Sequence, residues 1–433
     1  MKREGQRALQ WGSRVKTISA GVPAREGVRR SGRRIAQAAV IATAVMGMVS
    51  TEAAAVTSAD TPPRQWYLER MDAEKMWQKA TGEGVKIALI DSGVNPSTPS
   101  LAGQVLPGWD LRPEGSVRGQ TMDRNGQGTS HAELMVGTGE GGGIKGLAPG
   151  AKVIPMRIPL IKHDELPPIV YPVNRGIRRA VDEGAKIISI SVTSQWVAAG
   201  LDTFTNHADL EYAQSKGVLV FAAAGDNAKD GNKKQYPAAF PEVVGVGALN
   251  EDASRWVHTQ HGEVPDLAAP GAGLPRWCDA TFTRYCTDGA GTAAASALAA
   301  ASAALIWSLH PDWTSTQVLR VMYDTAGRGE DWAEGTRNIY FGYGSVRPGA
   351  HINRGKGTPG PADPGMPIDD VAPIAAASPS TANSPKPSAP AAATAQHGTG
   401  ESGSLLLYFV AASVAVVISG AAITFYRRRS TGR

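Results

Sequence analysis

Short apolar runs alternate with longer segments of helical periodicity through the middle of the chain. The apolar runs are rich in Val, Ile and Ala, which is typical of strands buried on both faces of a sheet. Strands and helices that alternate in this way predict βαβ units, and therefore an α/β fold with a mainly parallel central sheet and helices on both faces. The predicted strands are residues 85–90, 152–157, 186–192, 218–223 and 243–249, and the predicted helices begin after residue 128 and span residues 173–183, 208–216 and 292–310.

The segment from residue 292 to 310 is almost entirely Ala, Ser and Leu. A helix that is apolar on every side belongs in a protein interior, so we predict that this helix is central to the fold. Another helix is expected to start at Thr314, because Thr314 and Gln317 have the spacing of a capping box.

Both ends of the chain carry export and membrane signals. A basic stretch, an apolar run over residues 35–49 and three small residues predict a secretory signal peptide over residues 1–55. An uncleaved anchor is the alternative, although about 15 apolar residues is short for a membrane span of about 20. Residues 403–426 are long and apolar enough to form a transmembrane helix, and the arginines that follow predict a cytoplasmic tail over residues 427–433. The rest of the chain should therefore face the outside of the cell.

The composition divides the remainder of the chain into two parts. Residues 351–402 are mostly Pro, Ala, Ser, Thr and Gly. Such a segment buries too little apolar surface to offset its ordering entropy, so we predict a disordered spacer. Residues 56–350 should then form one folded domain.

Charge and cysteine content limit the possible partners and the compartment. The net charge is +5, but ten Lys and Arg residues lie within the first 34 positions, and three consecutive arginines lie at positions 427–429. The folded part is therefore near neutral or acidic, which argues against nucleic acid as a partner. The two cysteines, Cys278 and Cys286, are expected to form a disulfide in an oxidising exterior, with two unpaired buried thiols as the alternative.

Five motifs, in order along the chain, resemble those of the subtilisin-like serine proteases. Residues 85–94 (VKIALIDSGV) resemble the strand end that carries the catalytic Asp of this family, and residues 125–129 (NGQGT) resemble the motif that carries its catalytic His. Residues 145–151 (KGLAPGA) match the segment that follows, while residues 266–271 (DLAAPG) and 289–293 (GAGTA) resemble the approach to the nucleophile helix. The resemblance implies the family's three-layer α/β fold.

A narrower resemblance is to the mycosins, the membrane-anchored subtilases associated with bacterial type VII secretion. Residues 65–68 (QWYL) and 73–77 (AEKMW) resemble their N-terminal extension, and the signal peptide, spacer and terminal helix match their layout. The resemblance implies a single-pass protein of the bacterial cell membrane, with its folded domain on the extracytoplasmic side and components of the secretion system as candidate partners.

Carried over position by position, most of the family's catalytic residues are replaced. Acyl transfer by a serine enzyme needs a hydroxyl nucleophile, an imidazole base, an orienting carboxylate and donors for the oxyanion. Asp91 retains the carboxylate, but Gln127 occupies the His position and Ala293 the Ser position. Asp226 occupies the oxyanion Asn position, where a negative charge opposes catalysis; a protonated Asp226, or Asn227 in a shifted register, is the alternative donor.

Two nearby residues carry the missing chemical groups. His131 lies one helical turn after Gln127, about 6 Å away, which predicts that it is too far to replace the base without a shift of the helix. Ser296 should point into the core. We therefore expect Gln127 to donate an N–H to Asp91, with a turn-capping role for Asp91 as the alternative. His131 and Glu133 are interpreted as ordinary polar residues of a helix and not as metal ligands.

The sequence thus predicts a serine endopeptidase homologue that has lost its activity. Subtilases bind extended peptides by adding them as a strand, and the resemblance places this edge at Ser191, Val192 and Thr193. We expect a peptide or protein partner at the outer membrane face, linked to type VII secretion. An active endopeptidase with unconventional residues is one alternative, and a fold remnant without a peptide site is another. No cofactor is expected; structural calcium is common in the family, but these residues give it no position.

Overall fold

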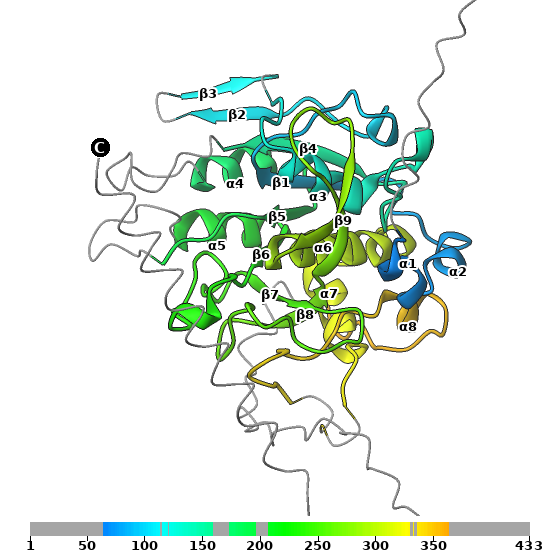
Figure 1. Cartoon of the computed structure of the whole chain (residues 1–433). Coiled ribbons are helices and arrows are strands. Elements are labelled where there is room, and N and C mark those ends of the chain that lie inside the picture. The colour runs from blue at the N-terminus through cyan, green and yellow to red at the C-terminus, as the bar shows by residue number, and fades with distance from the viewer. Residues whose placement is uncertain are drawn as a thin grey trace, which may run out of the picture. The chain divides into compact units, whose positions relative to one another are not determined.

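An eight-stranded sheet forms the centre of the computed structural model, which describes residues 64–112, 115–119, 121–158, 173–195, 207–329, 332 and 336–362. The strand order is β3-β2-β4-β1-β5-β6-β7-β8 (Figure 1). Neighbouring strands from β2 to β8 are parallel, and β3 joins the edge in the antiparallel direction. The strands of this sheet are β1 (Lys86–Asp91), β2 (Trp109–Arg112), β3 (Gly115–Arg118), β4 (Lys152–Arg157), β5 (Ile187–Ile190), β6 (Leu219–Ala223), β7 (Val244–Leu249) and β8 (Leu267–Pro270).

Helices cover both faces of the sheet, with α3 and α6 on one face and α4 and α5 on the other (Figure 1). The α-helices are α1 (Trp66–Arg70), α2 (Ala73–Trp77), α3 (Gln127–Val136), α4 (Val173–Asp182), α5 (His207–Ser215), α6 (Thr292–Leu309), α7 (Ser315–Asp324) and α8 (Pro348–Ile352). Three short 3₁₀ helices are η1 (Pro99–Leu101), η2 (Glu140–Gly142) and η3 (Ala228–Asp230).

The side chains of β1 explain why its sequence is a continuous apolar run. Ile87 and Leu89 belong to the hydrophobic core shared with α3 and α6, while Ala88 and Ile90 belong to the core shared with α4 and α5. Because side chains alternate between the faces of a strand, a strand covered on both sides is apolar at every position. The five predicted strands and the five predicted helices are confirmed, and so is the three-layer α/β fold.

Helix α6 is the predicted central helix. Every residue from Thr292 to Trp307 is buried. Within the described part of the chain it is the helix long and apolar enough to span a membrane, but 89% of its most apolar window is buried inside the protein, so it is a core helix. The predicted capping box of α7 is also present, since Gln317 N donates to Thr314 Oγ1 and Thr314 N donates to Gln317 Oε1.

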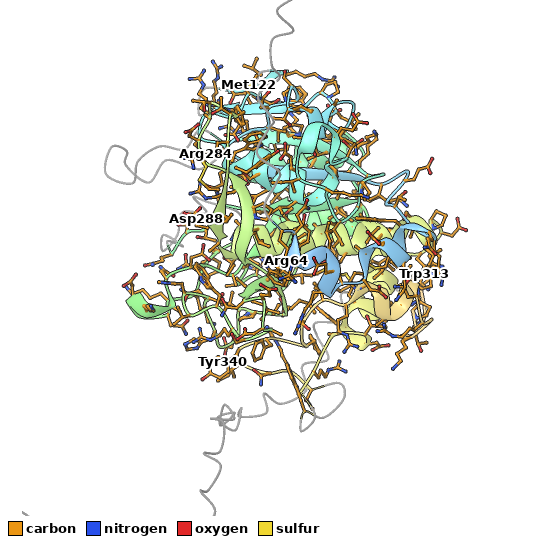
Figure 2. All side chains as sticks on the ribbon, turned by 45° about the vertical axis from the view of Figure 1, so that its right-hand side comes forward. Arg64, Met122, Arg284, Asp288, Trp313 and Tyr340 are labelled. Carbon is orange, nitrogen blue, oxygen red and sulfur yellow. A yellow bond between two sulfur atoms is a disulfide. The ribbon has the colours of Figure 1, made fainter. Side chains whose placement is uncertain are left out.

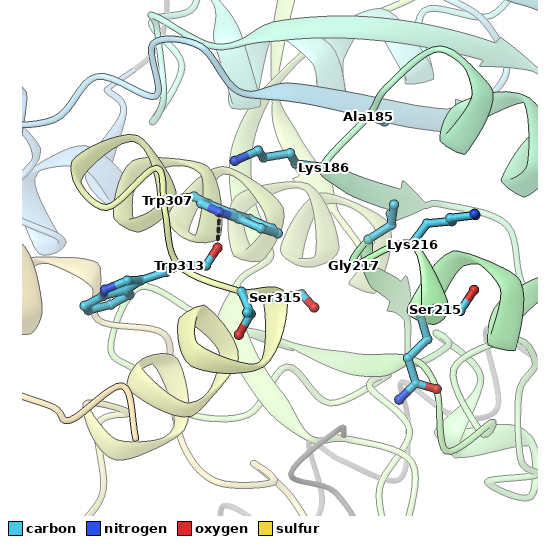
Figure 3. A pocket seen from close by; sticks show the side chains of 11 residues that line it. Ala185, Lys186, Ser215, Lys216, Gly217, Trp307, Trp313 and Ser315 are labelled. Atoms are coloured by element: carbon cyan, nitrogen blue, oxygen red, sulfur yellow. Dashed lines mark hydrogen bonds between the residues drawn. The ribbon is translucent and has the colours of Figure 1, made fainter. Parts of the chain in front are cut away.

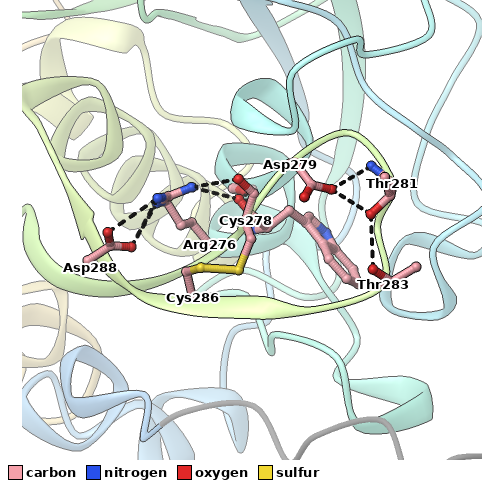
Figure 4. Close-up of a disulfide and its surroundings, with 9 residues drawn as sticks. Arg276, Cys278, Asp279, Thr281, Thr283, Cys286 and Asp288 are labelled. Atoms are coloured by element: carbon pink, nitrogen blue, oxygen red, sulfur yellow. Dashed lines mark hydrogen bonds and ion pairs between the residues drawn. A yellow bond between two sulfur atoms is a disulfide. The ribbon is translucent and has the colours of Figure 1, made fainter.

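A second, two-stranded antiparallel sheet, β9 (Ala272–Trp277) and β10 (Tyr285–Ala290), was not predicted. The Cys278–Cys286 disulfide closes this hairpin, which confirms the predicted pairing (Figure 4). Arg276 and Asp288 pair across the same two strands, with Arg276 Nε 3.1 Å from Asp288 Oδ1. A loop of this length contributes about 2–3 kcal/mol on the chain-entropy estimate.

The segment that precedes β1 is anchored to the core by polar contacts. Tyr67, in α1, is fully buried and donates its O–H to the carbonyl oxygen of Lys145 over 2.7 Å. Gln65 contacts Lys145 twice, through Nε2 to the Lys145 carbonyl oxygen and through Oε1 from the Lys145 backbone N–H. Trp66 Nε1 donates to the carbonyl oxygen of Gly273 in β9. The N-terminal extension is thus part of the folded unit.

The fold continues beyond the expected boundary at residue 350. Residues 351 and 352 end α8, and residues 359–361 contact α7, where Arg320 Nη1 donates to the carbonyl oxygens of Pro359 and Pro361, and Gln317 Nε2 donates to that of Gly360. The first residues of the segment that we expected to be a disordered spacer, 351–362, therefore contact the domain, because their carbonyl groups find donors on a helix that the composition of the segment does not reveal. The signal peptide, the rest of the spacer, the transmembrane helix and the tail lie outside the described residues.

Candidate functional site

The residues singled out in the sequence converge at the carboxyl ends of β1, β5 and β6, where they meet the amino ends of α3 and α6. Asp91 is the last residue of β1, and Ala293 is the second residue of α6. Ser191 follows β5 directly, and Asp226 comes three residues after β6. In a parallel sheet the strand carboxyl ends lie at one edge, which explains how segments far apart in the sequence reach one site.

Asp91 is bound to an imidazole. Its Oδ2 lies 2.7 Å from His131 Nδ1, and its Oδ1 accepts a 2.6 Å hydrogen bond from the backbone N–H of Ser92. Burial by itself raises the pKa of Asp91, but the His131 charge and hydrogen bond, together with hydrogen bonds from Ser191 and Ser92, lower the pKa below its usual value. Asp91, His131 and Ser191 are 1%, 7% and 8% exposed, so this cluster is nearly dry.

The expected hydrogen bond between Gln127 and Asp91 is wrong. The Gln127 side chain is exposed, and its backbone N–H donates to Asn125 Oδ1. Among the described residues, the imidazole partner of Asp91 comes from His131, one turn further along α3. Asp91 is therefore neither isolated nor limited to capping a turn.

The direction of helical side chains explains this correction. The Cα–Cβ bonds of a helix tilt toward its amino end, so a side chain covers the turn that precedes its own Cα. The axial separation of about 6 Å between Gln127 and His131 therefore does not have to be crossed in full, because the His131 side chain extends back toward the amino end of α3, where Asp91 lies. Gly128 completes the approach, since a Cβ at this position would lie 2.1 Å from the carbonyl oxygen of Gly93. Without that Cβ, α3 packs directly against the end of β1.

His131 does not form the Ser–His contact of a catalytic triad with Ser191. Ser191 Oγ lies 3.5 Å from His131 Nδ1, the same nitrogen that Asp91 contacts. In a triad the carboxylate and the nucleophile contact opposite ring nitrogens. Ser191 therefore lies on the Asp91 side of the imidazole, where its hydroxyl contacts both Asp91 and His131 Nδ1.

The amino end of α6 offers no hydroxyl at the expected nucleophile position. Ala293 is 8% exposed and carries a methyl group. Ser296 is fully buried and its Oγ lies 3.2 Å from Ser189 Oγ, so it points into the core as predicted.

Asp226 caps α6 from a separate segment. Its Oδ1 accepts hydrogen bonds of 2.8 Å from both the backbone N–H and the Oγ1 of Thr292, a favourable place for an anion because helix amino ends are electropositive. The residue is exposed as a whole, but its carboxyl group loses part of its solvation where it binds the first turn of α6. This desolvation raises the pKa of Asp226, against the hydrogen bonds from Thr292 and the charges of His131 and His258. Asn227, the alternative donor, accepts from Gln260 Nε2 through its Oδ1.

The segment after β5 has a free backbone edge. Ser194 exchanges two backbone hydrogen bonds with Tyr236, of 3.0 and 2.9 Å. Since backbone groups alternate in direction along an extended strand, the N–H and C=O of Thr193 point the other way. Within the described part of the chain, neither Val192 nor Thr193 forms a backbone hydrogen bond, and Thr193 is exposed.

Glu133 is a fully buried carboxyl group on the same helix as His131. Thr98 Oγ1 donates to its Oε1 over 2.7 Å, and the hydroxyl of Tyr285, in β10, donates to its Oε2 over 2.8 Å. Glu133 therefore links α3 to the disulfide-closed hairpin. Burial raises its pKa to about 7, although these two hydrogen bonds act in the opposite direction.

We expect the stability of the protein to fall as pH rises through the titration of Glu133. A folded pKa of about 7 exceeds the unfolded value of 4.5, so between these values the folded protein holds a proton that the unfolded chain has released. The contribution is complete below about pH 4.5 and lost near pH 7. Urea unfolding of the wild type and Glu133→Gln from pH 5 to pH 8 measures it, because the amide of the variant does not titrate.

The readout is the change with pH in the stability difference between the two proteins. We also expect a pH-independent difference in the free energy of unfolding, because the single amide oxygen of the variant cannot replace both carboxyl oxygens that accept hydrogen bonds from Thr98 and Tyr285. Asp266, whose pKa burial raises to about 6, is present in both proteins and cancels. A difference that stays constant from pH 5 to pH 8 contradicts the assignment to Glu133.

Two cavities in the described structure lie outside the immediate Asp91–His131 cluster. One of about 330 Å³ lies at the amino ends of β5 and β6, between the end of α6 and the start of α7, with Lys186 and Trp307 in its wall (Figure 3). Lys186 Nζ donates to the carbonyl oxygen of Pro311 and lies 4.9 Å from the centre of the Trp307 ring. No group of three or more His, Cys, Asp or Glu side chains suited to a metal ion occurs within the residues that the structure describes.

Comparisons with known proteins agree with this architecture. The model of the Subtilase family (Peptidase_S8) matches residues 82–344, so its match begins after α1 and α2. Thermitase of Thermoactinomyces vulgaris is 31% identical over 283 residues, which cover 64% of this chain and 95% of thermitase.

Two solved structures have a similar fold. MycP1 from Mycobacterium smegmatis superposes with a TM-score of 0.58 at 22% identity and covers 73% of this chain and 90% of its own. The MycP3 protease from the type VII (ESX-3) secretion system gives a TM-score of 0.57 at 25% identity, with 68% and 90% covered.

Proposed function

The chain belongs to the subtilase family, and from this premise we propose that it is a catalytically inactive member, a pseudoprotease that holds an extended segment of a peptide or protein partner. One observation carries the proposal: Ala293 supplies a methyl group at the amino end of α6, so the Asp91–His131 pair finds no hydroxyl at the family's nucleophile position. Acyl transfer requires an atom that attacks the carbonyl carbon, and a methyl group has none.

The oxyanion side of the site supports inactivity as well. Asp226 places a carboxyl group against the first turn of α6, where a tetrahedral intermediate needs hydrogen-bond donors. An ionised carboxylate at this position repels the negative charge that develops in the transition state. Both changes act on the chemical step and leave the binding edge intact.

Val192 and Thr193 are the proposed edge for the partner. Of the two, Thr193 points its N–H and C=O away from Tyr236 and toward the side of β1, because Ser191 N donates to Ile90 on that side and backbone groups alternate along the segment. These are the groups with which an added strand would pair. Such an interface draws its affinity from main-chain hydrogen bonds, so it tolerates many sequences and needs no catalytic residue.

We place the protein at the outer face of the bacterial membrane, as a single-pass protein held by residues 403–426. The basic residues at 427–429 favour a cytoplasmic tail, and the apolar run at 35–49 favours export of the folded domain. The likeness to MycP1 and MycP3 supports components of a type VII secretion system as partners.

The test of inactivity and binding uses the full-length chain. We expect no labelling by a fluorophosphonate probe and no cleavage of a peptide library, together with measurable binding of library peptides by fluorescence anisotropy. Thr193→Pro should lower peptide affinity at least about ten-fold, because proline removes the N–H donor, whereas the matched Thr193→Ala should change it less than about three-fold. Equal affinities of these two variants would refute the strand-addition interface.

The competing function is an active endopeptidase with unconventional residues. The Asp91–His131 pair favours it, because it preserves an oriented imidazole. Probe labelling of the wild type, lost in His131→Ala, would support this alternative over the pseudoprotease. Co-purification of the membrane form with secretion components would indicate a partner-binding protein. If no such component co-purifies, a fold remnant without a peptide site is favoured.

A further inference from the structure

A cavity of about 280 Å³ lies next to the Asp91 site, and its lining is strongly basic. Its residues are Asp110, Arg112, Met122, Arg124 and Arg157. Arg157 ends β4 at the level of Asp91, its register partner in β1. A Cβ on Gly93 would lie 3.0 Å from Arg157 Cδ and 3.0 Å from the backbone carbon of Met122, so the wall of the cavity touches the turn that follows Asp91.

One carboxylate balances three guanidinium groups in this cavity. Asp110 is fully buried and accepts hydrogen bonds from Arg112 Nε over 2.6 Å and from Arg157 Nη1 over 2.7 Å. Arg124 is exposed and forms no hydrogen bond or ion pair with any residue that the structure describes. Asp110 is thus shared by Arg112 and Arg157, and Arg124 is the guanidinium of this lining for which the described residues supply no carboxylate.

Arg157 also carries an unused donor. Its side chain is 12% exposed, and its Nε is buried without a hydrogen-bond partner among the described residues. A buried donor left unpaired is costly, so a small shift of this side chain that lets a ligand accept from Nε relieves that cost on binding. The planar guanidinium matches the two oxygens of a carboxylate better than it matches a neutral acceptor.

We propose that this cavity binds a carboxylate of the partner peptide, and so selects an acidic residue or a C-terminus. The inference rests on the proposed peptide-binding function and specifies its ligand. Met122, 50% exposed at the surface, provides an apolar rim for the part of the peptide that carries the carboxylate (Figure 2).

The position of the cavity favours a peptide as the source of the carboxylate. The sheet order places β4 and β2 two and three strands away from β5, whose end leads to Thr193. At about 4.8 Å between strands the separation is roughly 10–14 Å, which three or four extended residues span. Peptide residues beyond the stretch paired with Thr193 can therefore span the distance to the cavity where they turn across the end of β1.

The test measures peptide binding by the full-length chain and three variants. Selected peptides are compared with two kinds of variant. In one kind a single Asp or Glu is replaced by its amide, and in the other only the C-terminus is amidated, so that the two sources of a carboxylate are separated. One neutralisation should lower the affinity for the wild type about ten-fold, the value of one charge-assisted hydrogen-bond pair. Arg124→Gln should remove this preference, Arg124→Lys should retain part of it, and Arg70→Gln, an exposed arginine on α1, should leave it unchanged.

The outcomes separate the two proposals. If the wild type binds peptides and no neutralisation lowers their affinity, the carboxylate site is overturned but the pseudoprotease proposal is not. If the wild type binds no peptide, the proposed strand-addition interface is itself overturned. An acidic preference that survives in Arg124→Gln also contradicts this site. Inorganic sulfate serves as a second probe by calorimetry: if it binds in an Arg124-dependent manner while peptides show no preference, the cavity binds free anions and the assignment to a peptide is wrong.

Discussion

Ala293→Ser is expected to give the protein reactivity toward a fluorophosphonate probe and slow peptide hydrolysis, at least about 100-fold above the wild type. The substitution supplies the missing nucleophile at the amino end of α6. His131 Nδ1 faces Asp91, so its Nε2 is the nitrogen left to accept a proton. Helices α3 and α6 pack against each other, so His131 and the new serine lie on neighbouring helices. In subtilisin, loss of the nucleophile lowers the rate by about 10⁶-fold, so restoring a nucleophile leaves room for a large gain.

The gain should stay well below the rate of an intact enzyme because Asp226 remains. Adding Asp226→Asn should raise hydrolysis by a further factor of about 10²–10³, the usual value of one oxyanion donor. Ala293→Ser with His131→Ala is the control, since it keeps the hydroxyl and removes the base. If Ala293→Ser is as inert as the wild type while its fold is unchanged, His131 serves only as a partner for Asp91.

His131→Ala should lower the free energy of unfolding by about 3–5 kcal/mol at pH 7, the largest effect that we expect on stability. It leaves the carboxylate of Asp91, 1% exposed, without its charge partner. Chemical denaturation of the full-length chain measures the change. Gln127→Ala is the matched control on the same helix, and it should cost less than about 0.5 kcal/mol because that side chain is exposed.

The pH dependence of His131→Ala follows from the pKa of Asp91. In the wild type this pKa is lowered, so the stabilising contribution is present above the unfolded value of 3.8 and is lost as pH falls through the folded value. Without His131, the main contributions that lower the pKa of Asp91 are gone, and burial raises this pKa. Ionisation of Asp91 then destabilises the fold. The difference between wild type and variant should therefore widen from pH 4 to pH 8, and a difference that narrows over this range contradicts the pairing.

The elements predicted from periodicity were found because they depend on local pattern. The runs that became β1 and β7 are uncharged and buried over residues 87–90 and 244–249, since both sheet faces are covered there, and the apolar helix α6 packs on one of these faces. The hairpin of β9 and β10 was missed because its polar, turn-rich sequence has no such pattern. Its register depends on contacts to α3, such as the 2.8 Å hydrogen bond from the backbone N–H of Trp277 to Ser130 Oγ. It also depends on a disulfide between two residues that are close in sequence.

The identity of a side chain settles which chemistry is absent wherever that side chain lies: Ala293 has no hydroxyl, and Gln127 has no imidazole. The amino-acid order was likewise enough to predict the α/β fold and the pairing of Cys278 with Cys286, because both follow from short-range pattern and composition. Which imidazole meets Asp91 was decided only in three dimensions, by the backward tilt of a helical side chain and the contact that Gly128 permits. The arginine cavity arises in the same way, since its residues come from β2, β4 and the loop before α3, and only strand pairing brings their charges together.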